Sequence, residues 1–314
     1  MQNLWQKVVP DEKSKVALLS ITSNTVLVIL KVFAGIWTGS VSILSEAIHS
    51  SLDLVAALIA YIAVRISRKP PDEEHEYGHG KVENVSGTIE AILIFVAAIW
   101  IIIEAYDKLV HGSEVETVLV GIFVMAFAAV ANYLISSLLM KTARKTDSIA
   151  LEADAMHLRT DVYTSVGVLV GLGLIQLTGW TILDPIIAIF VAALIIKAAC
   201  DLTVEAFRPL LDSSLSDEEE TQIKNALDRV NADAVLGYHQ LRTRRSGAER
   251  YIDLHLVVAR DFTVEQSHEL AHRMEDEIQQ NLRNANVLIH VEPCTDEDCN
   301  QCLSECVRPK SPTI

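Results

Sequence analysis

Basic residues are scarce in this chain of 314 residues, which has 26 lysines and arginines against 41 aspartates and glutamates. The formal net charge is −15 at pH 7, and the acidic excess lies in the loops and from Asp212 onward. Nucleic-acid binding depends on cationic side chains that neutralise phosphates. The sequence therefore predicts no nucleic-acid partner, and its acidic residues are most simply those of a solvated surface.

Marks of secretion and of covalent catalysis are missing as well. The first dozen residues are polar and the first apolar run is of spanning length, so we expect no cleavable signal peptide. No nucleophile stands out in the sequence. We therefore expect a protein that is not an enzyme and carries no prosthetic group.

Charge is also rare along six apolar runs, each long enough to cross a bilayer as a helix. They are Val16 to Trp37, Ile43 to Arg65, Val85 to Leu109, Val118 to Met140, Ala150 to Leu177 and Ile182 to Phe207. Together with 50% hydrophobic content, they predict an α-helical integral membrane protein in the lipid bilayer, with six transmembrane helices in residues 1–208. The third and fifth runs contain ionisable residues, so these helices should face protein or water.

Cationic residues flank one side of this even-numbered topology. The opposite loops, residues 38–42, 110–117 and 178–183, hold almost none. Because loops rich in lysine and arginine stay in the cytoplasm, we expect both termini there.

Two pairs with the same spacing, His49-x3-Asp53 and His157-x3-Asp161, interrupt these apolar runs. Residues i and i+4 share one face of a helix, so each pair points an imidazole and a carboxylate the same way. Two such helices facing each other make a cage of four ligands. Two nitrogen and two oxygen donors suit Zn²⁺ best, with Co²⁺, Fe²⁺ and Mn²⁺ as alternatives. Four protein ligands also leave no open position for a catalytic water.

The segment after the second run, residues 69–80, is rich in proline and glycine and also contains metal-ligand types. Asp72, His75 and His79 form a candidate loop site, although Gly78 and Gly80 predict an irregular loop instead of a helix. A plain polar loop is the alternative interpretation.

Soluble patterns begin near Pro209. Ser216 and Glu219 have the spacing of a capping box, which predicts a helix to about Val230. Two alternating stretches, a further amphipathic helix and a last strand follow. They are Leu236 to Thr243 and Arg250 to Ala259 with a turn at Arg245 to Ala248, then Thr263 to Leu282 and Val287 to Val291. Residues 209–293 therefore read as an α-β-β-α-β domain.

Potential ligands recur in this domain, namely His239, His255, His268, His290 and Glu292. His290 and Glu292 share a strand face, and His255 lies on the polar face of its strand. These residues predict a regulatory metal site, with ordinary surface histidines as the alternative.

An acidic tail, residues 294–314, contains four of the five cysteines, Cys294, Cys299, Cys302 and Cys306. In a cytoplasmic tail we expect thiols and not disulfides. The spacing fits a Zn²⁺ or Cu⁺ clip, an iron–sulfur ligand set or plain reduced cysteines.

The chain resembles the cation diffusion facilitator family of divalent-metal transporters. The resemblance spans Lys15 to Cys294 and is carried by four motifs in order. These are Gly39-Ser-Val-Ser-Ile-Leu-Ser45 before His49-x3-Asp53, His75-x3-His79-Gly-Lys-x-Glu83, His157-x3-Asp161, and Asp184-Pro185 at the start of the sixth run.

The resemblance implies a homodimer that expels Zn²⁺ or a related ion from the cytoplasm in exchange for protons, and a ferredoxin-like fold for residues 209–293. It implies that His49, Asp53, His157 and Asp161 are the transport site, that Asp72, His75 and His79 are a loop site, and that the five ligands of the C-terminal domain form a site at the dimer interface. Zn²⁺ is then substrate and regulatory ligand.

Two details of the resemblance refine this expectation. Many bacterial members have aspartate where this chain has His49, and the histidine form is similar to the zinc-preferring branch. The loop between the fourth and fifth runs lacks the histidine-rich insertion of many eukaryotic members, which favours a bacterial-type protein in the inner membrane. A metal sensor or assembly scaffold that does not transport is the alternative function.

Overall fold

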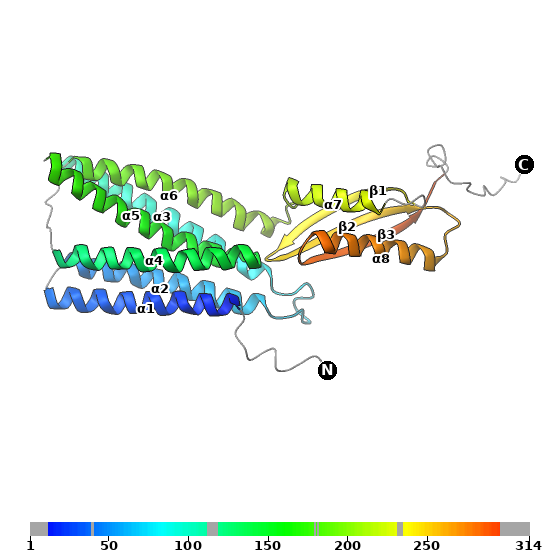
Figure 1. The fold of residues 1–314 in the computed structure, drawn as a ribbon, viewed down its shortest axis with the longest axis horizontal. Coiled ribbons are helices and arrows are strands. Elements are labelled where there is room, and N and C mark those ends of the chain that lie inside the picture. Colours follow the sequence, from blue (N-terminus) through cyan, green and yellow to red (C-terminus); the bar gives the residue numbers. More distant parts are fainter. Residues whose placement is uncertain are drawn as a thin grey trace, which may run out of the picture. The chain divides into compact units, whose positions relative to one another are not determined.

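The computed structural model describes residues 12–38, 41–111, 119–178, 180, 182–230 and 235–295. The chain divides into two compact units at residues 210 and 211. The first unit contains six long helices (Figure 1), which confirms the predicted helical part of the fold. They are α1 (Glu12–Thr38), α2 (Val41–Ser67), α3 (Lys81–His111), α4 (Leu119–Thr146), α5 (Ile149–Thr178) and α6 (Leu183–Phe207).

All of these helices except α5 are long and apolar enough, within the described residues, to count as candidate membrane spans. Helix α5 carries Asp154, His157 and Asp161 in its first half. It lies against α2, α3, α4 and α6, and its first half is largely buried among other helices. Many large apolar side chains of the other helices point outward, as expected for surfaces in contact with lipid.

Close helix packing around α3 depends on a glycine. A Cβ atom on Gly87 would lie 2.6 Å from Ile149 Cγ2 and 3.3 Å from Ala206 Cβ. Helices α5 and α6 therefore approach α3 at a point where only glycine leaves enough room. This contact fixes α5, which carries half of the predicted metal cage.

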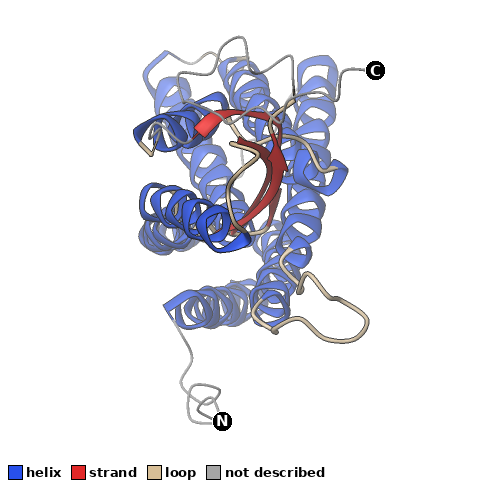
Figure 2. Cartoon of the chain, turned by 90° about the vertical axis from the view of Figure 1, so that its right-hand side faces the viewer, coloured by secondary structure: helices blue, strands red, loops and turns tan. Residues whose placement is uncertain are grey.

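The second unit has the predicted order α7 (Asp217–Arg229), β1 (Val235–Ser246), β2 (Glu249–Val258), α8 (Val264–Asn281) and β3 (Ala285–Pro293), which confirms the α+β fold. The sheet order is β1-β2-β3, with β1 antiparallel and β3 parallel to the central β2. Figure 2 shows the strands in red as a single curved sheet. The turn between β1 and β2 is shorter than expected, because the strands pair as far as Ser246 and Glu249. Gly247 has φ +60°, which glycine adopts at low cost.

Side chains alternate along β2 and place the core of this unit on one face of the sheet. Ile252, Leu254, Leu256 and Val258 are buried with residues of α7 and α8. Helix α7 starts with the predicted capping box, in which Ser216 and Glu219 satisfy each other's backbone amides. Because both helices pack on this buried face, the other face of the sheet is left for the polar side chains of the strands.

Candidate metal sites

Helices α2 and α5 bring the two His-x3-Asp pairs together. His157 Nε2 donates a hydrogen bond to Asp53 Oδ1 at 3.0 Å, and His49 Nε2 lies 4.0 Å from Asp161 Oδ1. Ligand atoms of His49, Asp53 and Asp161 all lie within 4.8 Å of one another. His157 is not part of that closest group, but its bond to Asp53 places it beside the same carboxylate. All four side chains therefore lie at one place between two helices.

Burial makes this a site where charge has to be balanced. Asp53 and His157 are 5% and 8% exposed, whereas His49 is open to the outside of the helices. The Oδ2 atom of Asp161 and the Nδ1 atom of His157 are buried without a hydrogen-bond partner among the described residues. Buried polar atoms of this kind are costly unless a ligand, a water or an ion satisfies them.

Sequence reasoning missed a lysine beside this site. Lys31 of α1 is 7% exposed, and its Nζ atom donates to Ser50 Oγ at 2.7 Å. Ser50 follows the candidate ligand His49 in α2. The only signal in the sequence was a lone lysine inside the first apolar run, which membrane energetics makes costly.

Two further carboxylates lie inside the helical unit. Glu90 of α3 and Asp154 of α5 are completely buried, and Ser86 Oγ donates to Glu90 Oε1 at 3.3 Å. Both oxygens of Asp154 are without a hydrogen-bond partner among the described residues. The interior of the helical unit therefore holds two buried carboxylates, one on α3 and one on α5, in addition to the four residues of the cage.

The predicted loop site also assembles, and it does so around Asp72. Its Oδ1 atom accepts from the backbone amide and the Nδ1 atom of His75, at 2.8 and 3.2 Å, and its Oδ2 atom lies 3.3 Å from His79 Nε2. The hydrogen bond from the His75 backbone amide holds the pKa of Asp72 below its usual value. Ligand atoms of all three residues lie within 4.8 Å of one another, on an irregular loop in which Gly78 has φ +78°.

This loop contains a pattern that sequence reasoning overlooked. His75-Glu76-Tyr77-Gly78-His79 has the letters of the His-Glu-x-x-His motif of zinc proteases. That motif works on a helix, where the two histidines share a face and the glutamate activates water. Here the segment is a turn between α2 and α3, so the helical context that the protease motif requires is missing.

The C-terminal unit aligns three histidines across its sheet. The strand register pairs His239 of β1 with His255 of β2, and His255 with His290 of β3. Glu292 joins them: His239 Nε2 donates to Oε2 at 3.0 Å, His255 Nδ1 donates to Oε1 at 2.8 Å, and His290 Nε2 lies 3.7 Å from Oε1. The hydrogen bond from His255 lowers the pKa of Glu292.

His268 is the predicted ligand that the structure does not bring into this cluster. It lies on α8, where its ring stacks on His272 with centroids 6.1 Å apart. Helix α8 covers the apolar face of the sheet, and the histidine cluster lies on the alternate side chains of β2. Within one chain, the sheet therefore separates His268 from the other four ligands.

The tail cysteines are described only in part. Cys294 is 2% exposed, and its backbone amide donates to Val258 O at 2.9 Å. Its carbonyl accepts from Arg260 at 3.0 Å, so it belongs to the edge of the folded unit. Cys299, Cys302 and Cys306 lie outside the described residues, and the metal clip stays a prediction.

Comparison with known proteins gives two family matches. Residues 17–211 match the cation efflux transmembrane domain, and residues 215–294 match the cytoplasmic domain of cation efflux proteins. The chain is 35% identical over 280 residues to the uncharacterized transporter sll1263 of Synechocystis, covering 89% of this chain and 90% of the relative. It is 33% identical over 283 residues to the cation-efflux pump FieF of Citrobacter koseri, covering 90% and 93%.

A solved structure of CzrB is 34% identical and covers 26% of this chain and 100% of its own, with a TM-score of 0.25, too low to support an argument. The two family matches together span both units, and the relatives are transporters and not enzymes. The chain therefore belongs to the cation diffusion facilitator family of cation efflux transporters and is an integral membrane protein.

Proposed function

We propose that this transporter exports Zn²⁺ from the cytoplasm in exchange for protons, through the site formed by His49, Asp53, His157 and Asp161. The observation that carries the proposal is the gathering of two imidazoles and two carboxylates between α2 and α5. This donor set provides four ligands, the number that Zn²⁺ prefers, and two negative charges that balance a dication.

Competition between protons and metal follows from the atoms involved. In the structure, His157 Nε2 lies 3.0 Å from Asp53 Oδ1, and a hydrogen bond at this distance requires a proton on the imidazole nitrogen, because an ionised carboxylate only accepts. Because a metal ion needs the lone pairs of those same atoms, binding must displace the proton. Cytoplasmic Zn²⁺ would then expel protons from the site, and protons entering from the other side would expel Zn²⁺. The two accessible states must differ in their affinity for metal and proton.

The two outer clusters have a regulatory role in this proposal. Asp72, His75 and His79, and His239, His255, His290 and Glu292, would each hold Zn²⁺ on the cytoplasmic side. His268 would complete a cluster only across a homodimer, because the sheet separates it from the cluster of its own chain. The distribution of lysine and arginine supports cytoplasmic termini, and the bacterial-type sequence supports an inner-membrane location.

Two other functions make different predictions. An exporter of Fe²⁺, Co²⁺ or Mn²⁺ would use the same donors, because these ions share ligand types with Zn²⁺. A sensor or assembly scaffold would bind metal without flux. A buried, charged cage is an expensive feature for a protein that only senses, which favours transport.

The test is uptake of Zn²⁺ into proteoliposomes driven by a pH gradient. We expect uptake by the parent and its loss in Asp161→Ala and in an Asp53→Ala, Asp161→Ala double variant, because two ligands and the charge balance are removed. Asp201→Ala is the matched control: it removes an exposed carboxylate from α6 and should keep the parent rate.

The outcomes separate the candidates. Flux that persists in the double variant, in correctly folded protein, would overturn the assignment of the site. Flux of another ion and not of Zn²⁺ would change the substrate. Bound metal without any flux would favour the sensor.

A further inference from the structure

Lys31 is a buried cation at the edge of the transport site. Its side chain is 7% exposed, on the part of α1 that packs against α2, and its Nζ atom donates to Ser50 Oγ at 2.7 Å. An ammonium group within a membrane span is costly, so a compensating partner is expected nearby. A serine hydroxyl is neutral and cannot supply that compensation.

Carboxylates of the metal site lie next to the serine that Lys31 contacts. Ser50 lies between His49 and Asp53 on α2, three residues before Asp53, so Lys31 is held on the side of α2 that carries the ligands. His49, the residue before Ser50, has its Nε2 atom 4.0 Å from Asp161 Oδ1. The hydrogen bond to Ser50 therefore brings an ammonium group from a third helix to the stretch of α2 beside both acidic ligands.

We propose that Lys31 is a resident counter-charge of the transport site, which stabilises the empty cage and weakens the binding of the metal enough for release. This inference rests on the proposed function of the cage. With neutral imidazoles, two carboxylates and a bound dication sum to zero, and the empty site carries two negative charges. Adding the lysine changes these sums to plus one and minus one. Counting the four ligands, the metal and Lys31, neither state then carries more than one net charge, whereas without the lysine the empty site would carry two.

If Lys31 had only a structural role, its positive charge would not affect the binding of Zn²⁺. If Lys31 only joined α1 to α2 through Ser50, a neutral donor of similar length would replace it. Lys31→Gln keeps a donor and removes the charge, and Lys31→Met keeps the length and apolar stem and removes both. The counter-charge predicts the same change in both variants, whereas a purely structural link predicts that Lys31→Gln resembles the parent.

The first measurement is Zn²⁺ affinity by titration calorimetry at pH 8 on the full-length protein in nanodiscs. Asp72→Ala and Glu292→Ala form the background, together with Cys299→Ser, Cys302→Ser and Cys306→Ser, so that the two outer clusters and the predicted tail clip are silenced. We expect Lys31→Met and Lys31→Gln to bind Zn²⁺ about tenfold more tightly or better, because a like charge beside the dication is removed. Lys197→Met is the matched control, since it removes an exposed lysine from α6, and its Kd should stay at the parent value.

The second measurement is the kinetics of Zn²⁺ uptake by the same variants. Tighter binding with slower release predicts that KM and the maximal rate both fall, whereas a damaged fold raises KM. Unchanged or weaker Zn²⁺ affinity in both neutral variants would overturn the role of Lys31. An Asp53→Ala, Asp161→Ala variant in the same background tests the cage itself: if it still binds Zn²⁺, the proposed function fails independently of Lys31.

Discussion

Glu219 takes part in two interactions at once. Its Oε2 atom accepts from the backbone amide of Ser216 to complete the cap of α7, and its Oε1 atom accepts from Arg250 Nε at 2.7 Å. Arg250 and Glu219 are 8% and 18% exposed, so this ion pair is largely shielded from water. Burial acts to raise the pKa of Glu219. The hydrogen bond and the positive charge of Arg250 outweigh this effect, so the pKa of Glu219 lies below its usual value.

Replacing Glu219 by glutamine should destabilise the C-terminal unit by about 1 to 2 kcal/mol at pH 7, because Arg250 loses its counter-ion while the cap is kept. The folded pKa of Glu219 is depressed, so its contribution is present above the unfolded pKa and is lost as the pH falls through the folded pKa. The gap in unfolding temperature between parent and variant should therefore close in acid. A gap that stays constant down to pH 3 would contradict this account.

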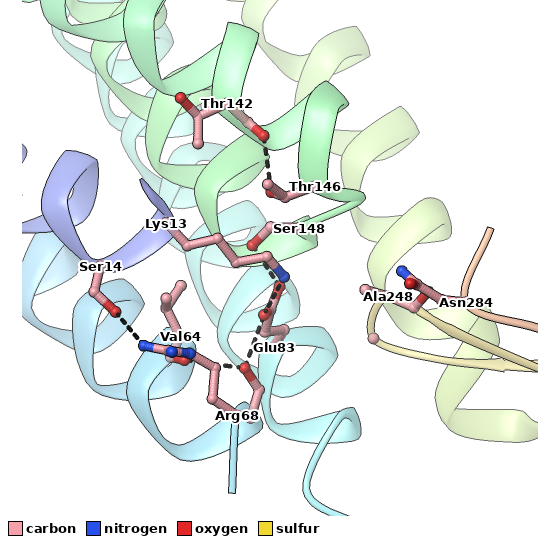
Figure 3. Close-up of polar contacts among 12 residues, drawn as sticks. Lys13, Ser14, Val64, Arg68, Glu83, Thr142, Thr146, Ser148, Ala248 and Asn284 are labelled. Atoms are coloured by element: carbon pink, nitrogen blue, oxygen red, sulfur yellow. Dashed lines mark hydrogen bonds and ion pairs between the residues drawn. The ribbon is translucent and has the colours of Figure 1, made fainter. Parts of the chain in front are cut away.

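At the scale of elements, Glu83 at the start of α3 forms hydrogen bonds to several other helices. Glu83 is 1% exposed, and its carboxylate accepts from Lys13 of α1 at 3.2 Å and from Ser148 just before α5 (Figure 3). It also accepts from Ser67 of α2 at 2.8 Å. A single carboxylate thus contacts elements that are far apart in sequence. Because these include both helices of the metal cage, Glu83 helps to fix the positions of α2 and α5.

Glu83→Ala should lower the stability of the helical unit by about 2 to 4 kcal/mol, because it removes the buried carboxylate that accepts from Lys13, Ser67 and Ser148. Thermal unfolding in detergent, followed by fluorescence, measures the effect. Glu12→Ala is the matched control, since it removes the partner of Lys145 in a pair whose side chains are 52% and 62% exposed. That exposed pair should contribute less than about 1 kcal/mol. Equal effects of the two substitutions would contradict the role given to Glu83.

At the scale of the whole molecule, the protein combines a membrane unit with a C-terminal unit that carries its own cluster of candidate ligands. The cluster lies on the sheet face opposite α8, and His268 lies on α8. A homodimer that brings α8 of one subunit to the sheet of the other would unite the five predicted ligands. Metal binding and association of subunits would then be linked.

Zn²⁺ should therefore tighten the dimer by about tenfold or more at saturation, as a ligand that binds only the associated form does. Analytical ultracentrifugation of the full-length protein in detergent, with and without Zn²⁺, measures the dimer dissociation constant. Glu292→Ala and His268→Ala should each remove the dependence on Zn²⁺. Asp253→Ala is the control, because Asp253 lies on β2, the strand of His255, and is not one of the candidate ligands. Loss of the dependence in Glu292→Ala alone would show that His268 takes no part.

The sequence by itself determined what depends on neighbouring residues. Apolar runs of spanning length predicted six helices, and the capping box of Ser216 and Glu219 predicted the start of α7 within one residue. The i, i+4 spacing predicted that His49 shares a helix face with Asp53, and His157 with Asp161. These properties follow from the helical and strand repeats, which act over a few residues of chain.

Only the tertiary structure decided which of these faces meet. It placed α2 against α5, aligned His239, His255 and His290 across three strands, and separated His268 from them by the sheet. It also brought Lys31 into contact with Ser50, which the spacing of residues in the sequence does not predict. Such contacts depend on helix packing and on strand register between segments that are distant in sequence. The close approach of helices at Gly87 and the burial of whole apolar faces select which helices and strands become neighbours.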